Sequence, residues 1–175
     1  GEWRAECALK GIGGYLPHAA SLTAFGNTVP TSFLRLVPHQ EAPTSICWGD
    51  RNRSVLVRVP LGWQHIDDSM FRDANPNESP ITGLPNDSQT VELRSPDGSA
   101  AIHLLLAGIV VAARLGLTQP GMADYPRERK VDGAASQTPG LDQPPSSCFE
   151  APARLPAPRA HYDASGLLPT RPLPP

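Results

Sequence analysis

Proline is the residue that most restricts how this chain can fold. Of its 175 residues 21 are proline, nine of them in residues 1–117 and twelve in residues 118–175. Each proline fixes its own φ angle, lacks a backbone N–H and disrupts a helix interior. We therefore expect regular helices and strands in the first two thirds of the chain, and poorly helical, partly extended structure in the last third.

The charge balance and the cysteines exclude several classes of protein. Fifteen Lys and Arg residues against 17 Asp and Glu give a formal net charge of −2, which fits neither a strongly basic nucleic-acid-binding protein nor an acidic, solvating chain. Three widely spaced cysteines indicate free thiols in a reducing compartment. The longest apolar stretch, residues 100–113, is too short to span a membrane and fits a buried core helix. We expect a cytoplasmic protein without nucleic-acid or membrane partners.

Apolar residues recur at helical spacing through residues 2–25. Pro17 should split that helix, and the pair Gly26-Asn27 should end it. After a proline-interrupted loop, residue alternation and turn residues predict three short strands. They cover residues 45–48, 54–59 and 90–94.

Alternation within the last two strands predicts which side chains share a face. In residues 54–59 the three valines lie on one face, and Ser54, Leu56 and Arg58 lie on the other. In residues 90–94 Glu92 and Arg94 lie on the outward face as neighbours. Their proximity indicates either an ion pair, or a metal-binding carboxylate beside an arginine that stabilises a transferring phosphoryl group.

A helix over residues 99–116 is the most strongly indicated element, and Asp97 or Ser99 should cap its start. The other stretches are predicted to be irregular or broken. They are a surface loop at 61–88, a linker at 118–145 and a proline-interrupted helix at 146–162.

Thirteen of the fifteen basic residues are arginine. A nucleotide bias in the source genome would explain this number, but arginine is also the residue that binds planar anions through two parallel hydrogen bonds. Five arginines lie at strand edges or in loops between strands, where they would suit a phosphate or carboxylate site or surface salt bridges. They are Arg35, Arg51, Arg53, Arg58 and Arg94.

Three groups of residues occur in one order along the chain, and together they resemble the glutamine synthetase family over residues 10–117. The groups are Asn27…Arg35-Leu36-Val37-Pro38…Glu41-Ala42-Pro43, Arg51-Asn52-Arg53-Ser54…Arg58-Val59-Pro60 and Glu92-Leu93-Arg94-Ser95-Pro96-Asp97. Residues 146–162 show a fainter similarity to the family's last helix. The resemblance implies an α+β fold, the C-terminal part of the catalytic domain, with antiparallel strands backed by helices and a Pro-rich C-terminal segment. Residues 1–117 would be the partial catalytic domain and 118–175 a Pro-rich linker with a degraded last helix.

The resemblance also implies an activity. Members of this family are ATP-dependent ligases that join ammonia to glutamate by way of γ-glutamyl phosphate, with Mg²⁺ or Mn²⁺. They are cytoplasmic and assemble as homo-oligomeric rings. For this chain the expected small-molecule partners are therefore glutamate, ammonia and ATP.

Matching positions imply roles for six residues. Arg35 resembles the arginine that binds the glutamate carboxylate, and Glu41 the acid on the flap that helps to form the ammonium site. Arg94 resembles the arginine near the γ-carboxylate during transfer. Glu41, Arg53 and Arg94 are thus the predicted catalytic residues.

The other three implied roles concern ATP and metal. Arg53 resembles the arginine that serves both phosphate and glutamate, and Arg58 the one on the ATP phosphates. Glu92 resembles a metal ligand. These assignments place the predicted site on the strands and on the loop that precedes them.

The sequence also departs from the family pattern. It contains no counterpart of the family's N-terminal β-grasp domain or of most metal-binding glutamates, and one glutamate cannot hold two or three metal ions. We therefore expect the isolated chain to be inactive. Two alternatives remain: a γ-glutamyl-amine ligase of the same family, and a non-catalytic remnant that acts by binding or regulation.

Overall fold

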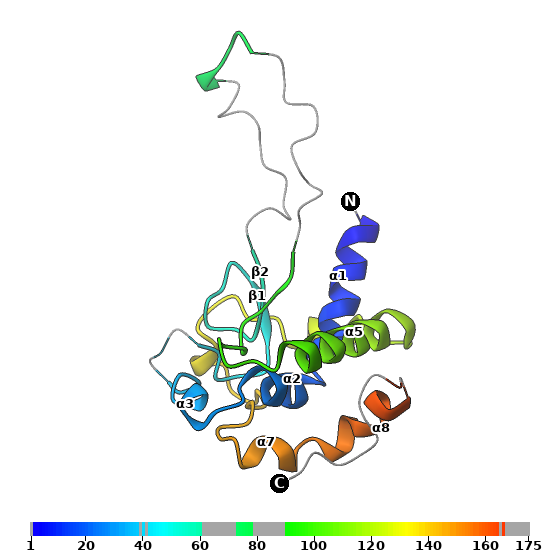
Figure 1. The fold of residues 1–175 in the computed structure, drawn as a ribbon. Coiled ribbons are helices and arrows are strands. Elements are labelled where there is room, and N and C mark those ends of the chain that lie inside the picture. The colour runs from blue at the N-terminus through cyan, green and yellow to red at the C-terminus, as the bar shows by residue number, and fades with distance from the viewer. Residues whose placement is uncertain are drawn as a thin grey trace.

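A small sheet and two long helices form the centre of the fold (Figure 1). The structure is a computed structural model that describes residues 2–38, 40, 42–60, 73–78, 90–164 and 166. The strands are β1 (Trp48–Asp50), β2 (Val57–Val59) and β3 (Glu92–Leu93). The α-helices are α1 (Glu2–Tyr15), α2 (Ala19–Gly26), α3 (Pro30–Phe33), α5 (Ile102–Thr118), α6 (Asp124–Arg127), α7 (Glu150–Ala153) and α8 (Pro156–Ala164), and η2 (Ala135–Gln137) is a 3₁₀ turn.

Pro17 splits the N-terminal helix, as predicted. Helix α1 ends at Tyr15, two residues before this proline, and α2 begins at Ala19. Proline has no N–H to continue the helical hydrogen bonds, and it disfavours the helical conformation of the preceding residue. The second helix ends at Gly26, which confirms the predicted boundary.

The three strands form one sheet in the order β1-β2-β3. Strands β2 and β3 are antiparallel, as expected, whereas β1 and β2 run parallel. All three strands are shorter than predicted. Residues 53–56 are bent rather than extended, and the amide of Ile46 donates to the carbonyl oxygen of Asp142 at 2.7 Å outside the sheet. The mixture of helices and a small sheet confirms the α+β class.

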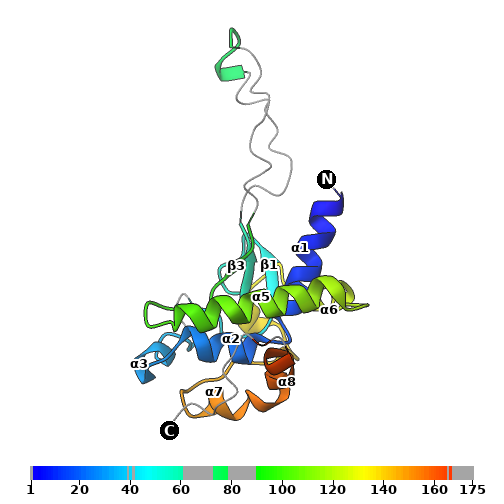
Figure 2. The same cartoon turned by 45° about the vertical axis from the view of Figure 1, so that its right-hand side comes forward.

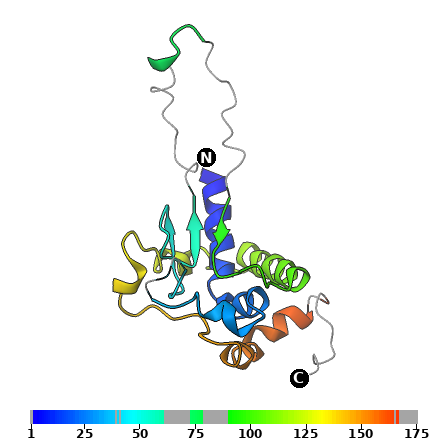
Figure 3. The same cartoon turned by 60° about the vertical axis from the view of Figure 1, so that its left-hand side comes forward.

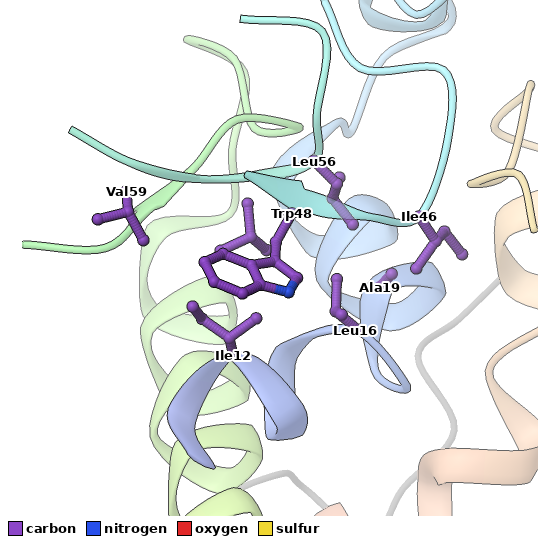
Figure 4. Packing of buried hydrophobic residues seen from close by; sticks show 8 residues of the cluster. Ile12, Leu16, Ala19, Ile46, Trp48, Leu56 and Val59 are labelled. Atoms are coloured by element: carbon purple, nitrogen blue, oxygen red, sulfur yellow. The ribbon is translucent and has the colours of Figure 1, made fainter. Parts of the chain in front are cut away.

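The main core lies between the sheet and the first two helices (Figure 4). Ile12 of α1 and Leu16, which directly follows α1, point toward the indole of Trp48. The Nε1 of Trp48 donates to the carbonyl oxygen of Pro126 at 2.5 Å. Leu56 was predicted to lie opposite the valines, but it is fully buried in this core together with Val57. Strict alternation fails there because the extended strand begins only at Val57.

The stretch predicted as a linker contacts β1 directly. The amide of Trp48 donates to the carbonyl oxygen of Arg129 at 3.1 Å, and the amide of Val131 donates to the carbonyl oxygen of Trp48 at 2.9 Å. Lys130 forms an ion pair with Asp50 at 2.9 Å. Residues 129–131 therefore close the outer edge of β1.

Helices α1 and α5 cross at van der Waals distance (Figure 2). Gly14 and Gly116 make this approach possible: a Cβ atom on Gly14 would lie 1.9 Å from the carbonyl oxygen of Ala112, and one on Gly116 would lie 2.1 Å from that of Lys10. The two backbones thus touch at a point where no side chain larger than hydrogen fits.

Helix α5 differs from its prediction in start, cap and burial. It begins at Ile102, and neither Asp97 nor Ser99 caps it. Instead the Asp97 carboxylate accepts bonds from the amide and hydroxyl of Ser99. The amide of Ala101 is held by the carbonyl oxygen of Phe25, so the helix starts after this attachment. The helix is not buried all round, because its outer side carries exposed Ile102, Leu106, Val110 and Leu117.

The prolines break the C-terminal helix as predicted, and the pieces α7 and α8 lie beneath α2 (Figure 3). Pro152 falls in the first turn of α7 and Pro156 is the first residue of α8. First-turn N–H groups have no intrahelical acceptor, so prolines there cost few hydrogen bonds. Ala151 packs against Phe33 and Leu36. None of the helices that the structure describes is long and apolar enough to cross a membrane.

Thiol labelling should distinguish the three cysteines. Cys47 is fully buried, and burial raises the pKa of its thiol to about 11, whereas Cys7 and Cys148 are partly exposed. Because the thiolate is the reactive form, iodoacetamide at pH 8 should label Cys7 and Cys148 and leave Cys47 unmodified until urea unfolds the chain. Peptide mass spectrometry of native and unfolded samples measures this, and equally fast labelling of Cys47 in the native protein would contradict the fold.

Candidate functional site

Arg58, Glu92 and Arg94 form a charged cluster on neighbouring strands. The antiparallel register places Arg58 of β2 opposite Glu92 of β3. The Nη2 atom of Arg58 lies 2.5 Å from Oε2 of Glu92, and Nε of Arg94 lies 3.5 Å from Oε1. The predicted proximity of Glu92 and Arg94 is confirmed, and the register adds Arg58 as the closer partner.

The guanidinium of Arg94 is the most firmly held of the three charged groups. Its side chain is only 11% exposed, and its Nη1 donates to the carbonyl oxygen of Val55 at 3.5 Å. Its backbone amide donates to the carbonyl oxygen of Leu56 at 2.9 Å. Side chain and backbone of Arg94 are thus both fixed to the residues that lead directly into β2, the strand that carries Arg58.

Arg35 reaches the same region from the loop after α3. Its Nη2 donates to the carbonyl oxygens of Ser95 and Pro96 at 2.5 and 3.2 Å, and its Nη1 to that of Arg94 at 3.4 Å. Asn27 accepts a longer bond of 3.5 Å from the same guanidinium. Arg35 therefore holds the chain that leaves β3, directly beside Arg94.

Two guanidinium N–H groups at this site are buried without an acceptor. They are the Nε groups of Arg35 and Arg58. Both arginines therefore retain an unused donor, and leaving such a buried donor unpaired costs about 1–3 kcal/mol of stability. Oxygen atoms of a carboxylate or phosphate are the acceptors for which arginine is best suited.

Arg53 lies exposed in the connection between β1 and β2. Because β2 begins only at Val57, the alternation that would put Arg53 and Arg58 on opposite faces does not apply between them. Glu41, the sixth predicted residue, lies outside the described residues. The structure thus brings together Arg35, Arg58, Glu92 and Arg94, with Arg53 on the adjoining connection.

Asn52 is a positioning residue that sequence reasoning missed. Its Oδ1 accepts from the amide and hydroxyl of Ser54 at 2.9 and 2.8 Å, and its Nδ2 donates to the carbonyl oxygens of Val131 and Gly133. The neighbouring Arg51 has a φ of 55°. An Asn two residues before a Ser is the sequence signal of this Asx turn, which fixes the loop that carries Arg53.

Asp97 adds a negative charge next to Arg35. Burial raises the pKa of its carboxyl, but hydrogen bonds from Ser99 and Ser32 and the charge of Arg35 lower the pKa by more. The net pKa is below its ordinary value, so Asp97 stays ionised at neutral pH. Its charge partly compensates the charge of the partly buried guanidinium of Arg35.

The order, spacing and grouping of these arginines coincide with a match to known proteins. A family model described as glutamine synthetase, catalytic domain, matches residues 2–160. The chain belongs to the glutamine synthetase family. The match extends past residue 117 and includes the stretch that closes the edge of β1.

Curated glutamine synthetases resemble the chain over most of its length. The protein from Thermococcus kodakarensis is 34% identical over 165 residues, which cover 93% of this chain and 32% of the relative. The one from Pyrococcus abyssi is 33% identical over 153 residues, which cover 86% of this chain and 30% of the relative. The chain therefore spans about a third of the length of the glutamine synthetases it matches.

Solved structures of the family share the fold. Ligand-free GmaS superimposes with a TM-score of 0.62 and 25% identity, over 93% of this chain and 31% of GmaS. The Plasmodium falciparum glutamine synthetase gives a TM-score of 0.61 at 16% identity, over 92% of this chain and 35% of that one, which supports the fold alone. The predicted family and α+β class are confirmed.

Glutamine synthetases generally use ATP and divalent metal ions, and the two requirements fit the described residues differently. The unpaired Nε groups of Arg35 and Arg58 fit an anion such as phosphate. Mg²⁺ prefers an octahedral shell of oxygen ligands. The carboxylate of Glu92 lies between two guanidinium groups. The described part of the chain contains no group of three or more His, Cys, Asp or Glu residues that could hold a metal ion. These residues alone do not make a Mg²⁺ site.

Proposed function

We propose that this chain supplies the anion-binding arginines of a glutamate–ammonia ligase, which uses ATP to join ammonia to glutamate. The observation that carries this proposal is the grouping of Arg58, Glu92 and Arg94 on paired strands. Phosphoryl transfer needs fixed positive charge that neutralises the phosphate oxygens and aligns donor with acceptor. A rigid sheet that presents two arginines with restricted side chains meets this need.

Within the proposed site each arginine has a separate task. Arg53 and Arg58 bind the phosphates of ATP, and Arg53 also contacts glutamate. Arg94, held by Val55 and Glu92, steadies the γ-carboxylate. Arg35 binds the glutamate carboxylate through its unused Nε, while its other nitrogens keep their bonds to the backbone.

Besides these arginines, the proposed enzyme needs an acid that binds ammonium and several metal ligands. Glu41 would attract and deprotonate ammonium on the flap, and Glu92 would be one of several metal ligands, with Mg²⁺ or Mn²⁺ as the ion. The active assembly would be a homo-oligomeric ring. Because Glu92 is the only described residue proposed as a metal ligand, we expect the isolated chain to form no glutamine from ATP, glutamate and ammonia, and no amide from an added amine. Product in either assay would contradict this assignment.

Binding of ATP to the 175-residue chain tests the proposal without requiring turnover. Arg58→Gln should weaken binding about tenfold or more, because a charge-assisted hydrogen bond of about 1.5–3 kcal/mol is lost. In buffer with EDTA, Glu92→Gln should instead strengthen binding, since the carboxylate occupies Arg58 and repels phosphate. Isothermal titration calorimetry measures both effects.

Arg127→Gln provides the matched control, since Arg127 is an exposed arginine on α6 that pairs with Asp124. It should leave ATP affinity unchanged. Tripolyphosphate should compete with ATP if the phosphates are what the site recognises. Equal affinities of wild type and Arg58→Gln, or weaker binding by Glu92→Gln in EDTA, would show that this cluster does not bind ATP phosphates.

A further inference from the structure

The C-terminal helix α8 is attached to the body of the protein through two adjacent side chains. Tyr162 is 1% exposed, and its hydroxyl lies 2.5 Å from Oγ of Ser21 in α2. Its ring makes an edge contact with Phe25. His161 lies beside it and meets His18, which is 4% exposed in the turn between α1 and α2. Figure 2 shows α8 against this corner, below α5.

The hydrogen bonds of His18 fix its neutral tautomer. Its Nδ1 lies 2.9 Å from the carbonyl oxygen of Gly14, and a carbonyl oxygen can only accept, so Nδ1 carries the proton. In neutral His18 the other nitrogen, Nε2, therefore has a lone pair. It lies 3.1 Å from Nδ1 of His161, which must donate to it.

This arrangement tolerates one added proton but not two. His161 can donate to His18 whether its own ring is neutral or charged. If His18 is also protonated, both facing nitrogens carry hydrogen and both rings carry positive charge. Two like charges at this distance, one of them in a buried ring, repel strongly.

Among the described contacts of His18, no negative group would offset a second positive charge. From α8 the titratable groups are His161 and Tyr162. From α2 the hydroxyl of Ser21 donates to the backbone carbonyl oxygen of His18, and from α1 the carbonyl oxygen of Gly14 accepts from its ring. The ion pair of Arg159 and Asp163 lies on the exposed side of α8. Burial lowers the pKa of His18, and the charge of His161 lowers it further. The hydrogen bond to Gly14 raises this pKa, but the net pKa is below its ordinary value.

We propose that His18 and His161 form a proton-sensitive latch that holds α8 on the α1–α2 corner at neutral pH and releases it when both imidazoles are charged. The pKa of His18 in the docked state is lowered, so its contribution is complete above the ordinary pKa of about 6.5. That contribution is lost as the pH falls through the lower, docked value. Attachment of α8 should therefore weaken in mild acid while α5 remains folded.

Hydrogen exchange of the full chain in EDTA, followed by NMR between pH 7.5 and 5.0, tests the latch. Protection factors, which already exclude the intrinsic pH dependence of exchange, should fall in α8 by about tenfold for each pKa unit that separates the docked and free states. The fall should follow the titration of the His18 ring. Protection in α5 serves as the internal reference and should stay constant.

Three variants separate the latch from general loss of stability. His161→Gln keeps a side chain that can donate or accept, so the acid-induced loss of α8 protection should shrink about threefold or more relative to wild type. Tyr162→Phe removes the bond to Ser21 and should lower α8 protection equally at every pH. His103→Gln, an exposed histidine on α5, should change nothing. The latch is refuted if α8 protection in His161→Gln falls with pH as in wild type, or if it stays constant as His18 titrates. It is also refuted if the pH dependence of α8 protection changes when EDTA is omitted, because a metal ion shared by the two rings would then replace the proton.

Discussion

Replacing Gly14 with alanine should strongly destabilise the protein. The added Cβ would lie 1.9 Å from the carbonyl oxygen of Ala112. The Cβ is fixed directly to the backbone of α1 and the oxygen belongs to the backbone of α5, so neither atom can rotate away. Overpacking of this kind costs about 3 kcal/mol or more when the backbones must separate. For a domain of this size that corresponds to a fall in Tm of about 6–12 °C, measurable by circular dichroism.

Gly11→Ala is the matched control, three residues earlier in the same helix. A Cβ there would meet nothing within 4 Å, so the substitution should only raise helix propensity and stabilise the fold by about 0.5–1 kcal/mol. Opposite signs for the two variants are the expected result. A Gly14→Ala protein that melts at the wild-type temperature would mean that α1 and α5 do not cross at this point.

Arg35→Met should also lower the free energy of unfolding strongly. This substitution separates a structural role of Arg35 from its proposed role in binding. The guanidinium donates to the carbonyl oxygens of Ser95, Pro96 and Arg94. Methionine would leave these acceptors without a donor, at a cost of about 2–4 kcal/mol in the free energy of unfolding. Urea unfolding of the ligand-free chain measures this, because no substrate contributes to the result.

Arg127→Met, which removes an exposed arginine, is the reference variant. Its free energy of unfolding should lie within about 0.5 kcal/mol of the wild-type value. If Arg35→Met is equally mild, the arginine contributes little to the stability of the fold. A large cost in the ligand-free chain would instead mean that this residue builds the proposed site before any ligand binds. Only the second outcome agrees with its bonds to residues 94–96, which follow β3.

Features that depend on neighbouring residues could be predicted from the sequence. Pro17 breaks a helix wherever it occurs in one, and Glu92 and Arg94 share a strand face because they are two residues apart. The resemblance to glutamine synthetases indicated the arginines of the proposed site. None of these signals requires knowledge of a distant partner.

Features that depend on distant residues could not be predicted. Alternation gives the face of Arg58 but not its register, so its pairing with Glu92, 34 positions later, was invisible. The bonds of Arg35 to the backbone of residues 94–96 span about 60 positions. The start of α5 was misjudged for the same reason, since Phe25 holds the residue before it. Whether Arg35, Glu41, Arg53, Arg58, Glu92 and Arg94 act as proposed depends on the binding experiments.

The closure of β1 by residues 129–131 determines when this fold can be completed during synthesis. Strand β1 is made early, but the backbone groups that cover its outer edge are separated from it by about 80 residues. Joining such distant segments carries a large loop-closure entropy, which slows folding. During synthesis the outer edge of β1 therefore stays open until residues 129–131 have emerged from the ribosome.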